Sequence, residues 1–316
     1  MKSRIRLGVV QPETYWGAEE RRNLREAIGY VESASRLGID LLAFPENYPG
    51  PYRAAERYEV VEPMQAASAE HRVSLAFGTS LETAPGSDRY HIATVLTNDD
   101  GSIAGICRRT HPRGPYIYLG GDLWDFHYQE ADEIEPIDMG WGKVGVATCS
   151  EAFVPEVARL QALRGAELCL FPTGIVIDEL GYTDNWRTLV RARAIENLMY
   201  TALTVHLFRP EFADRYRQST SEHAPSASGL TRGIAMVCSP ERILTQSEAP
   251  GIVTADLDLD RVRHLRETKE ELIVPAPYQT IPGVLSWRRP ELLGGLTGGA
   301  VEETIDQEFL PLEPTW

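Results

Sequence analysis

The run Lys143-Val-Gly-Val-Ala-Thr-Cys-Ser-Glu-Ala-Phe-Val-Pro-Glu156 reads as a short strand that delivers one cysteine to its C-terminal end. The apolar and β-branched residues 144–148 favour a buried strand. Polar residues follow Cys149 at once, and Pro155 suits the first turn of a helix. A cysteine at such a junction can face a cleft near the positive end of a helix, which favours the thiolate. The alternative is a small buried hydrophobe, because free cysteine is among the most buried residue types.

Strand and helix patterns alternate on both sides of this run. Strands are predicted at 5–10, 41–44, 73–78, 92–97, 168–171, 201–207 and 252–257, with a hairpin at 234–244. Amphipathic or long helices are predicted at 19–37, 155–164 and 184–199. No Ser/Gly-rich linker or internal repeat divides the chain, so one layered α/β domain is predicted over residues 1–265. Residues 266–316 are proline-rich with little periodicity, and we expect an extension that wraps over the body or a partner subunit, with disorder as the alternative.

The composition is that of a water-soluble globular protein and excludes several classes of partner. Of the 316 residues, 43% are hydrophobic and 24% are charged. The net charge is −15 and no basic run occurs, which argues against nucleic acid and against an anionic membrane surface. No apolar run could cross a bilayer and the N-terminus carries no cleavable signal, so a cytoplasmic location is expected.

The sequence also gives no indication of a bound metal or cofactor. The four cysteines are widely spaced and lack any CxxC pattern, so neither a disulfide framework nor a zinc site is expected. No glycine-rich phosphate loop follows a strand, and no His/Asp/Glu cluster has metal-ligand spacing.

Two other predicted strands end in charged residues that could join Cys149. Leu41-Leu-Ala-Phe-Pro-Glu-Asn-Tyr-Pro-Gly50 places Glu46 directly after a buried strand, although a helix cap or a solvated carboxylate is the simpler reading of that residue alone. Cys107-Arg-Arg-Thr-His111 places Arg109 at the end of another strand, where a solvated pair of arginines is the alternative.

These runs resemble those of the nitrilase superfamily, the carbon–nitrogen hydrolases. Phe44-Pro-Glu-Asn47 is similar to the motif of the family's glutamate base, and Gly142–Glu151 to the motif around its nucleophilic cysteine. Further similar runs are Arg164-Gly-Ala-Glu-Leu168, Phe171-Pro172, Arg191-Ala-Arg-Ala-Ile-Glu-Asn197 and Ala255-Asp-Leu-Asp-Leu-Asp-Arg261. The resemblance implies a four-layer α-β-β-α sandwich that assembles as a homodimer or a larger homo-oligomer.

The resemblance further implies a catalytic set of Glu, Lys and Cys acting on a small molecule. Glu46 and Cys149 match two of these positions, but Arg109 stands where the family has lysine. Arginine keeps the positive charge and should lower the pKa of Cys149, yet it cannot release a proton near neutral pH. Substrate contacts are expected from Tyr116, Tyr118, Glu151, Thr173 and Trp186. For the two tyrosines, packing within an exposed loop is the alternative.

The predicted function is cysteine-dependent hydrolysis of a non-peptide C–N bond through a thioester on Cys149. A small amide is favoured over a nitrile because Ser150-Glu151 lacks the tryptophan that many nitrilases place after the cysteine. Two alternatives remain open. The same thioester could pass its acyl group to an amine, or the chain could be a non-catalytic homologue that keeps the fold.

Overall fold

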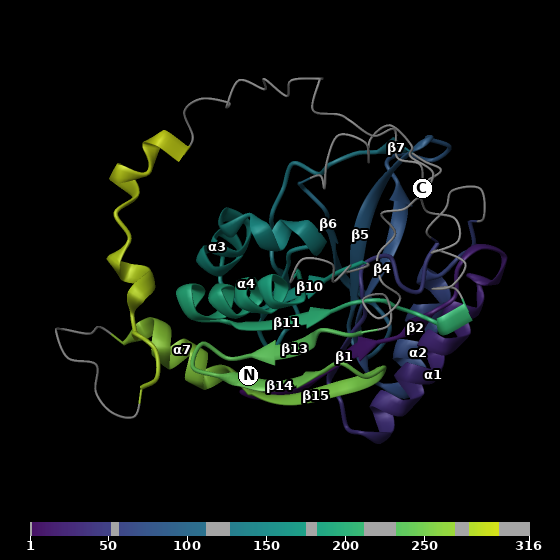
Figure 1. Cartoon of the computed structure of the whole chain (residues 1–316), viewed down its shortest axis with the longest axis horizontal. Coiled ribbons are helices and arrows are strands. Elements are labelled where there is room, and N and C mark those ends of the chain that lie inside the picture. Colours follow the sequence, from purple (N-terminus) through teal and green to yellow (C-terminus); the bar gives the residue numbers. More distant parts are fainter. Residues whose placement is uncertain are drawn as a thin grey trace.

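Two sheets face each other at the centre of the fold (Figure 1). The computed structural model describes residues 2–51, 57–111, 127–174, 182–211, 232–268 and 278–296. The first sheet has the order β15-β1-β3-β4-β5-β6, with β7 beside β5. Its strands are β1 (Arg4–Gln11), β3 (Leu41–Ala43), β4 (Ser74–Glu82), β5 (Arg89–Thr97), β6 (Ile103–Arg108), β7 (His127–Tyr128) and β15 (Gly251–Asp258).

The second sheet has the order β14-β13-β11-β10-β9-β8. Its strands are β8 (Ile137–Asp138), β9 (Lys143–Val146), β10 (Ala166–Pro172), β11 (Tyr200–Thr204), β13 (Ala235–Cys238) and β14 (Ile243–Ser247). A small parallel pair consists of β2 (Glu13–Thr14) and β12 (Leu207–Phe208). Strand β9 pairs in parallel with β10, and β3 with β4, so the C-terminal ends of each pair lie at the same end of its sheet. Cys149 follows β9 and Glu46 follows β3 at these ends.

Helices cover the outer face of each sheet. Figure 1 shows α1 (Arg22–Arg36) and α2 (Val61–His71) together on one side, and α3 (Pro155–Leu163) and α4 (Tyr182–Asn197) together on the other. The chain continues into α7 (Leu259–Glu267). Short 3-10 helices are η1 (Gly17–Glu19), η4 (Cys149–Phe153), η5 (Val284–Trp287), η6 (Pro290–Leu292) and η7 (Gly294–Leu296). Within the described ranges, every helix is too short or too polar to cross a membrane.

Three apolar cores separate the layers. Side chains alternate between the two faces of a strand, and strand β1 therefore contributes to two of these cores. Leu7 and Val9 point between the two sheets, whereas Val10 points toward α1. A second core joins α1 and α2 to the first sheet, and a third joins α3 and α4 to the second sheet. The predicted four-layer α-β-β-α sandwich is thus confirmed.

The predicted strands and helices are present, with shifted boundaries. The helix predicted from Glu19 begins at Arg22, because Gly17–Glu19 forms a separate 3-10 turn. The cysteine strand ends at Val146 rather than at Thr148. The sequence patterns missed α2 and α7 altogether. Because α7 continues to Glu267, it crosses the predicted boundary at residue 265, and the division into a domain and an extension stays a prediction.

The described part of the extension leaves the body beside α7. The amide of Gly283 donates to the carbonyl of Leu265 at 2.7 Å, and η5 lies against α4. Beyond η5, the side chains of Leu292 and Leu296 are exposed.

Arg266 ties α7 to the end of α4 and to β10. Its Nε donates to the carbonyl of Leu198 at 2.8 Å, and its Nη2 to the carbonyls of Ala166 at 2.5 Å and Asn197 at 3.3 Å. Burial lowers the pKa of Arg266 to about 10, which marks a cation removed from water and held largely by backbone carbonyls.

Replacing Arg266 with methionine should therefore destabilise the protein. The change leaves three carbonyls without their charged donor, and we expect a loss of about 3 kcal/mol in the free energy of unfolding. Denaturant unfolding at pH 7 measures it. The control is Arg4→Met, whose side chain is 79% exposed and should cost less than about 0.5 kcal/mol. Equal losses in the two variants would contradict this role for Arg266.

Candidate active site

Glu46 lies in a turn that two glycines allow. It follows β3, is only 4% exposed, and precedes Asn47, whose φ of 51° is in the left-handed region. A Cβ on Gly78 of β4 would lie 2.3 Å from the Asn47 amide nitrogen, so the turn packs directly on backbone. A Cβ on Gly174 would lie 2.8 Å from Glu46 Oε2. The backbone of the turn thus occupies the space that Gly78 leaves, and the carboxylate occupies the space that Gly174 leaves.

His206 fixes the backbone of Glu46 from the opposite side. Its Nε2 lies 2.6 Å from the Glu46 carbonyl oxygen, and its Nδ1 lies 2.8 Å from Thr14 Oγ1. Because a carbonyl only accepts, Nε2 carries the proton, and neutral His206 accepts at Nδ1 from the threonine hydroxyl. Burial lowers the pKa of His206 to about 4, which keeps the ring neutral in this arrangement.

His206 should make the fold sensitive to acid. Its folded pKa lies below the unfolded value of about 6.5, so its contribution is fully present above pH 6.5 and is lost as the pH falls toward 4. The difference corresponds to about 3 kcal/mol in the free energy of unfolding. Denaturant unfolding between pH 7 and pH 4 should show this loss in the wild type and a flatter dependence in His206→Gln. The exposed His264→Gln serves as control and should keep the wild-type slope. A wild-type slope in His206→Gln would contradict the prediction.

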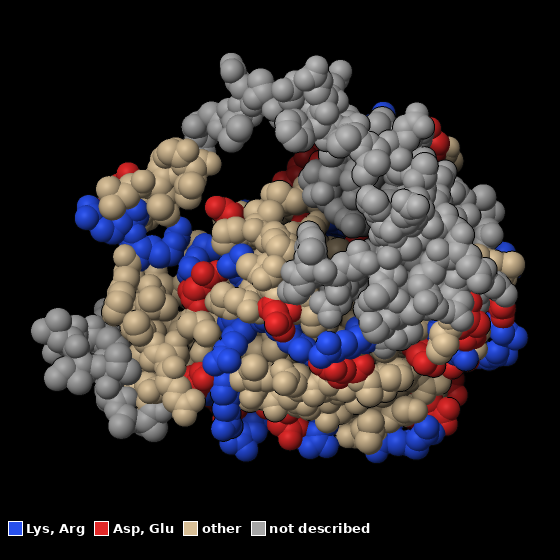
Figure 2. Space-filling view, viewed as in Figure 1, with Lys and Arg blue, Asp and Glu red and all other residues tan. Residues whose placement is uncertain are grey.

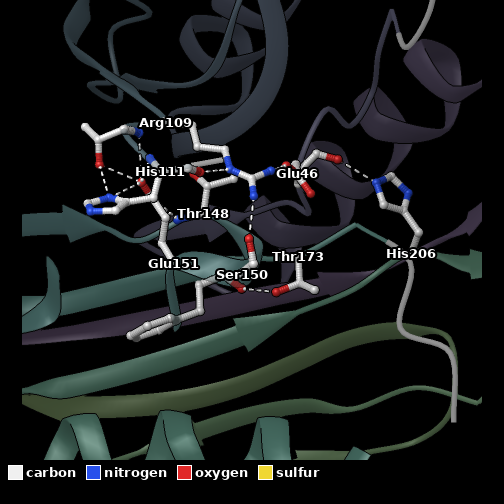
Figure 3. A network of polar contacts seen from close by, with 10 residues as sticks. Glu46, Arg109, His111, Thr148, Ser150, Glu151, Thr173 and His206 are labelled. Atoms are coloured by element: carbon white, nitrogen blue, oxygen red, sulfur yellow. Dashed lines mark hydrogen bonds and ion pairs between the residues drawn. The ribbon is translucent and has the colours of Figure 1, made fainter. Parts of the chain in front are cut away.

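Arg109 is buried, and each of its three guanidinium nitrogens donates a hydrogen bond. It follows β6 and is 7% exposed. Nη1 donates to Glu46 Oε1 at 3.0 Å, Nη2 to Ser150 Oγ at 2.5 Å, and Nε to the His111 carbonyl at 2.8 Å (Figure 3). Arg109 therefore joins Glu46 to the residue next to Cys149.

Cys149 lies where β9 gives way to a 3-10 turn. It is the first residue of η4 and has φ 51°, a left-handed conformation that non-glycine residues rarely adopt. Thr148 and Glu151 form a capping box around this turn, with the Thr148 amide donating to Glu151 Oε2 at 2.6 Å. Strained backbone of this kind is often found at active sites.

Glu151 braces the turn of Cys149 against the strand end of Arg109. Its Oε1 accepts from the Thr110 amide at 2.8 Å, the Thr110 hydroxyl at 2.7 Å and the His111 amide at 3.1 Å. Burial alone would raise the pKa of Glu151, but hydrogen bonds from His111, Thr110 and Thr148 outweigh it and lower the pKa. The hydrogen bond to Glu151 in turn raises the pKa of His111. The geometry therefore gives Glu151 an anionic bracing role.

The remaining predicted substrate contacts lie at different places. Thr173 is buried directly after β10, where its hydroxyl donates to the Phe171 carbonyl at 3.3 Å. Trp186 is packed between α4 and the second sheet, with its ring edge-on to Phe153 at 5.2 Å. Tyr116 and Tyr118 lie outside the described residues. The structure thus brings Glu46, Arg109 and the turn of Cys149 together, and places Trp186 in an apolar core.

This arrangement combines a carboxylate, a permanent cation and a thiol, the groups needed for nucleophilic acyl chemistry with a base and a charge stabiliser. Within the described ranges, no three His, Cys, Asp or Glu side chains are grouped so that they could hold a metal ion. The contact with Ser150 had no distinguishing signal in the sequence beyond its position next to Cys149.

Comparisons with known proteins show which family the chain belongs to. A family model described as carbon-nitrogen hydrolase matches residues 6–267. A deaminated glutathione amidase of Homo sapiens is 26% identical over 294 residues, covering 88% of this chain and 81% of that protein. The crystal structure of a carbon-nitrogen hydrolase from Helicobacter pylori G27 matches with a TM-score of 0.73 at 23% identity, covering 93% of this chain and 98% of that one.

A solved mutant of the amidase from Nesterenkonia sp. AN1 matches with a TM-score of 0.69 at 18% identity, covering 92% of this chain and 97% of that one. In that structure the acetamide moiety of fluoroacetamide is added covalently at the active site cysteine. The family model spans most of the present sequence, and the chain belongs to the carbon–nitrogen hydrolase family of the nitrilase superfamily.

Proposed function

We propose that this enzyme hydrolyses a small amide through a thioester on Cys149, with Glu46 as base and Arg109 as charge stabiliser. The observation that carries the proposal is the buried ion pair between Arg109 and Glu46 at 3.0 Å, which Arg109 extends to Ser150 beside Cys149. A buried ion pair has a high desolvation cost and is weak evidence for stability, so its place beside a strained cysteine favours a catalytic role.

The proposed reaction has two halves that share one base. Glu46 takes the proton from Cys149 Sγ, and the thiolate attacks the amide carbon to form a C–S bond. The tetrahedral intermediate collapses, and the C–N bond breaks as Glu46 returns the proton to the departing nitrogen. Glu46 then takes a proton from water, which attacks the thioester. As the C–S bond breaks, Glu46 returns this proton to Cys149 Sγ, which releases the acid and restores the thiol and the carboxylate.

Arg109 acts in this scheme as a fixed charge. A guanidinium group cannot give up its proton near neutral pH, so every proton passes through Glu46. The charge stabilises the anionic oxygen of both tetrahedral intermediates and the thiolate that precedes the first.

An amide is the favoured substrate class. The relatives include a protein named deaminated glutathione amidase, and covalent addition at the active site cysteine is recorded for the Nesterenkonia amidase. The proposed substrate contacts are Tyr116, Tyr118, Glu151, Thr173 and Trp186.

We further propose a cytoplasmic homodimer or larger homo-oligomer. Apolar side chains are exposed along η4, α3 and α4, namely Phe153, Leu160, Leu163 and Ile195, and Trp287 of η5 is 54% exposed. Figure 2 shows tan surface over α3 and the η5–η7 segment, bordered by charged residues. Burial of this surface against a second copy would remove it from water. Sedimentation equilibrium of the full chain measures the assembly.

The test of the proposed function is a panel of aliphatic, dicarboxylic and peptide-derived amides, scored by ammonia release and by the mass of the intact protein. Turnover of an amide, with a covalent acyl adduct on the peptide that contains Cys149, supports the proposal. Repeating the reaction with an added amine separates hydrolysis from acyl transfer, because transfer yields a new amide in place of the acid. The proposal is contradicted if an amide is turned over without leaving an adduct on Cys149 and if alkylation of Cys149 does not affect that turnover.

A further inference from the structure

Ser150 connects the buried cation to the turn of the cysteine. Its Oγ accepts from Arg109 Nη2 at 2.5 Å, as Figure 3 shows. We propose that Ser150 is a positioning residue that holds the guanidinium plane of Arg109 against the Cys149 turn, and so allows arginine to serve as the charge stabiliser. The inference rests on the proposed function for its catalytic consequence.

The three partners of Arg109 belong to segments that follow strands of two different sheets. Glu46 and the His111 carbonyl lie on segments that follow strands of the first sheet. Ser150 lies in η4, which follows β9 of the second sheet. Of these three contacts, the one with Ser150 therefore fixes the distance between the cation and the turn that carries the nucleophile.

The planarity of the guanidinium makes this contact matter. Arginine offers donors on three nitrogens in one rigid plane, so engaging Nη1 and Nη2 with different partners sets both the position and the rotation of the plane. The donor is charged, which makes the hydrogen bond stronger than one between neutral groups. Without the Ser150 hydroxyl, the contacts to Glu46 and to the His111 carbonyl remain, and both hold the guanidinium on the side of the first sheet. The guanidinium can then shift toward them and away from Cys149, and a displacement of about 1 Å in a catalytic group can cost roughly 100-fold in rate.

A lysine at position 109 could not make the same pair of contacts. Its side chain carries a single nitrogen at about the place of the guanidinium carbon, one bond short of both Nη atoms. Removal of the Ser150 hydroxyl should therefore matter while arginine is present and matter little when lysine replaces it. This dependence separates positioning of Arg109 from a general structural role of Ser150.

The test is a cycle of four proteins: wild type, Ser150→Ala, Arg109→Lys and the double variant. On an amide substrate, Ser150→Ala should lower kcat by roughly 10- to 100-fold with a smaller change in KM. In the Arg109→Lys background the same change should alter kcat by less than about twofold. Ser239→Ala, which removes a hydroxyl from the remote turn between β13 and β14, should leave kcat unchanged. Unchanged kcat in Ser150→Ala, or an equal loss in both backgrounds, overturns the inference.

Two further measurements test the positioning role of Ser150 independently of the proposed amidase function. The rate of Cys149 alkylation by iodoacetamide should be several-fold lower in Ser150→Ala than in the wild type. The double variant should be alkylated at the same rate as Arg109→Lys, and neither comparison requires that any amide is turned over. A crystal structure of Ser150→Ala should show the guanidinium displaced by about 1 Å or more from its wild-type place. A guanidinium that keeps its place overturns the positioning role even in a protein without amidase activity. Absence of turnover with a displaced guanidinium counts against the proposed function alone.

Discussion

Cys149→Ala is expected to abolish turnover of every amide that the wild type hydrolyses. No thioester can form without the sulfur, and the expected loss in kcat is roughly 10⁴-fold or more. Folding should be kept, because Cys149 is half-buried at the start of η4 and the capping box of Thr148 and Glu151 does not involve its side chain. Intact-protein mass spectrometry should show the acyl adduct in the wild type and none in the variant.

The other cysteines provide the control for this experiment. Burial raises the pKa of Cys107 to about 12 and that of Cys238 to about 11, and it also raises the pKa of the fully buried Cys169. Iodoacetamide at pH 7 should therefore label Cys149 selectively, and Cys107→Ala should keep both activity and labelling. Turnover by Cys149→Ala, or inactivation by alkylation of another cysteine, would falsify the assignment of the nucleophile.

Two parts of the candidate site, Glu46 and Cys149, could be predicted because each comes after a strand with a strong apolar signal. Residues 41–44 and 144–148 are continuous apolar or β-branched runs, and a residue directly after a buried strand lies at the edge of its sheet. The resemblance to a known family then selected Glu46, Arg109 and Cys149 from the polar residues at these ends. The four-layer order also came from that resemblance, since alternating strands and helices alone allow several layered folds.

The two helices that the sequence patterns missed, α2 and α7, were missed for physical reasons. Helix α2 buries only Met64, Ala67 and Ser68, two of them small, so it shows no clear apolar stripe. Helix α7 is rich in arginine, and its buried face is Leu259, Val262 and Leu265.

Contacts between distant segments are likewise absent from any local pattern. His206 and Glu46 are 160 residues apart, and Arg109 and Ser150 are 41 apart. Such pairs depend on how the two sheets stack, which no periodicity encodes.

Glu46→Gln is expected to lower kcat by roughly 10²- to 10⁴-fold with the fold intact. The amide oxygen of glutamine can still accept from Arg109 Nη1, so the shape of the site is retained while its base is lost. Both halves of the reaction should slow, since the same carboxylate activates the thiol and later the water. Single-turnover kinetics with an activated ester measures them separately as adduct formation and adduct decay.

A second, partly buried ion pair distinguishes loss of the base from loss of an ion pair. Glu167 is 8% exposed and pairs with Arg263 of α7 at the start of β10, the end of that strand opposite the site. Because the Arg263 side chain is 27% exposed, Glu167→Gln should lower the free energy of unfolding by only about 1 kcal/mol, and it should leave kcat within about twofold. If Glu46→Gln keeps a wild-type kcat, or if both variants lose activity to the same degree, Glu46 acts only as the counter-ion of Arg109. A selective loss in Glu46→Gln makes it the group that moves the proton, because the neighbouring guanidinium cannot release one.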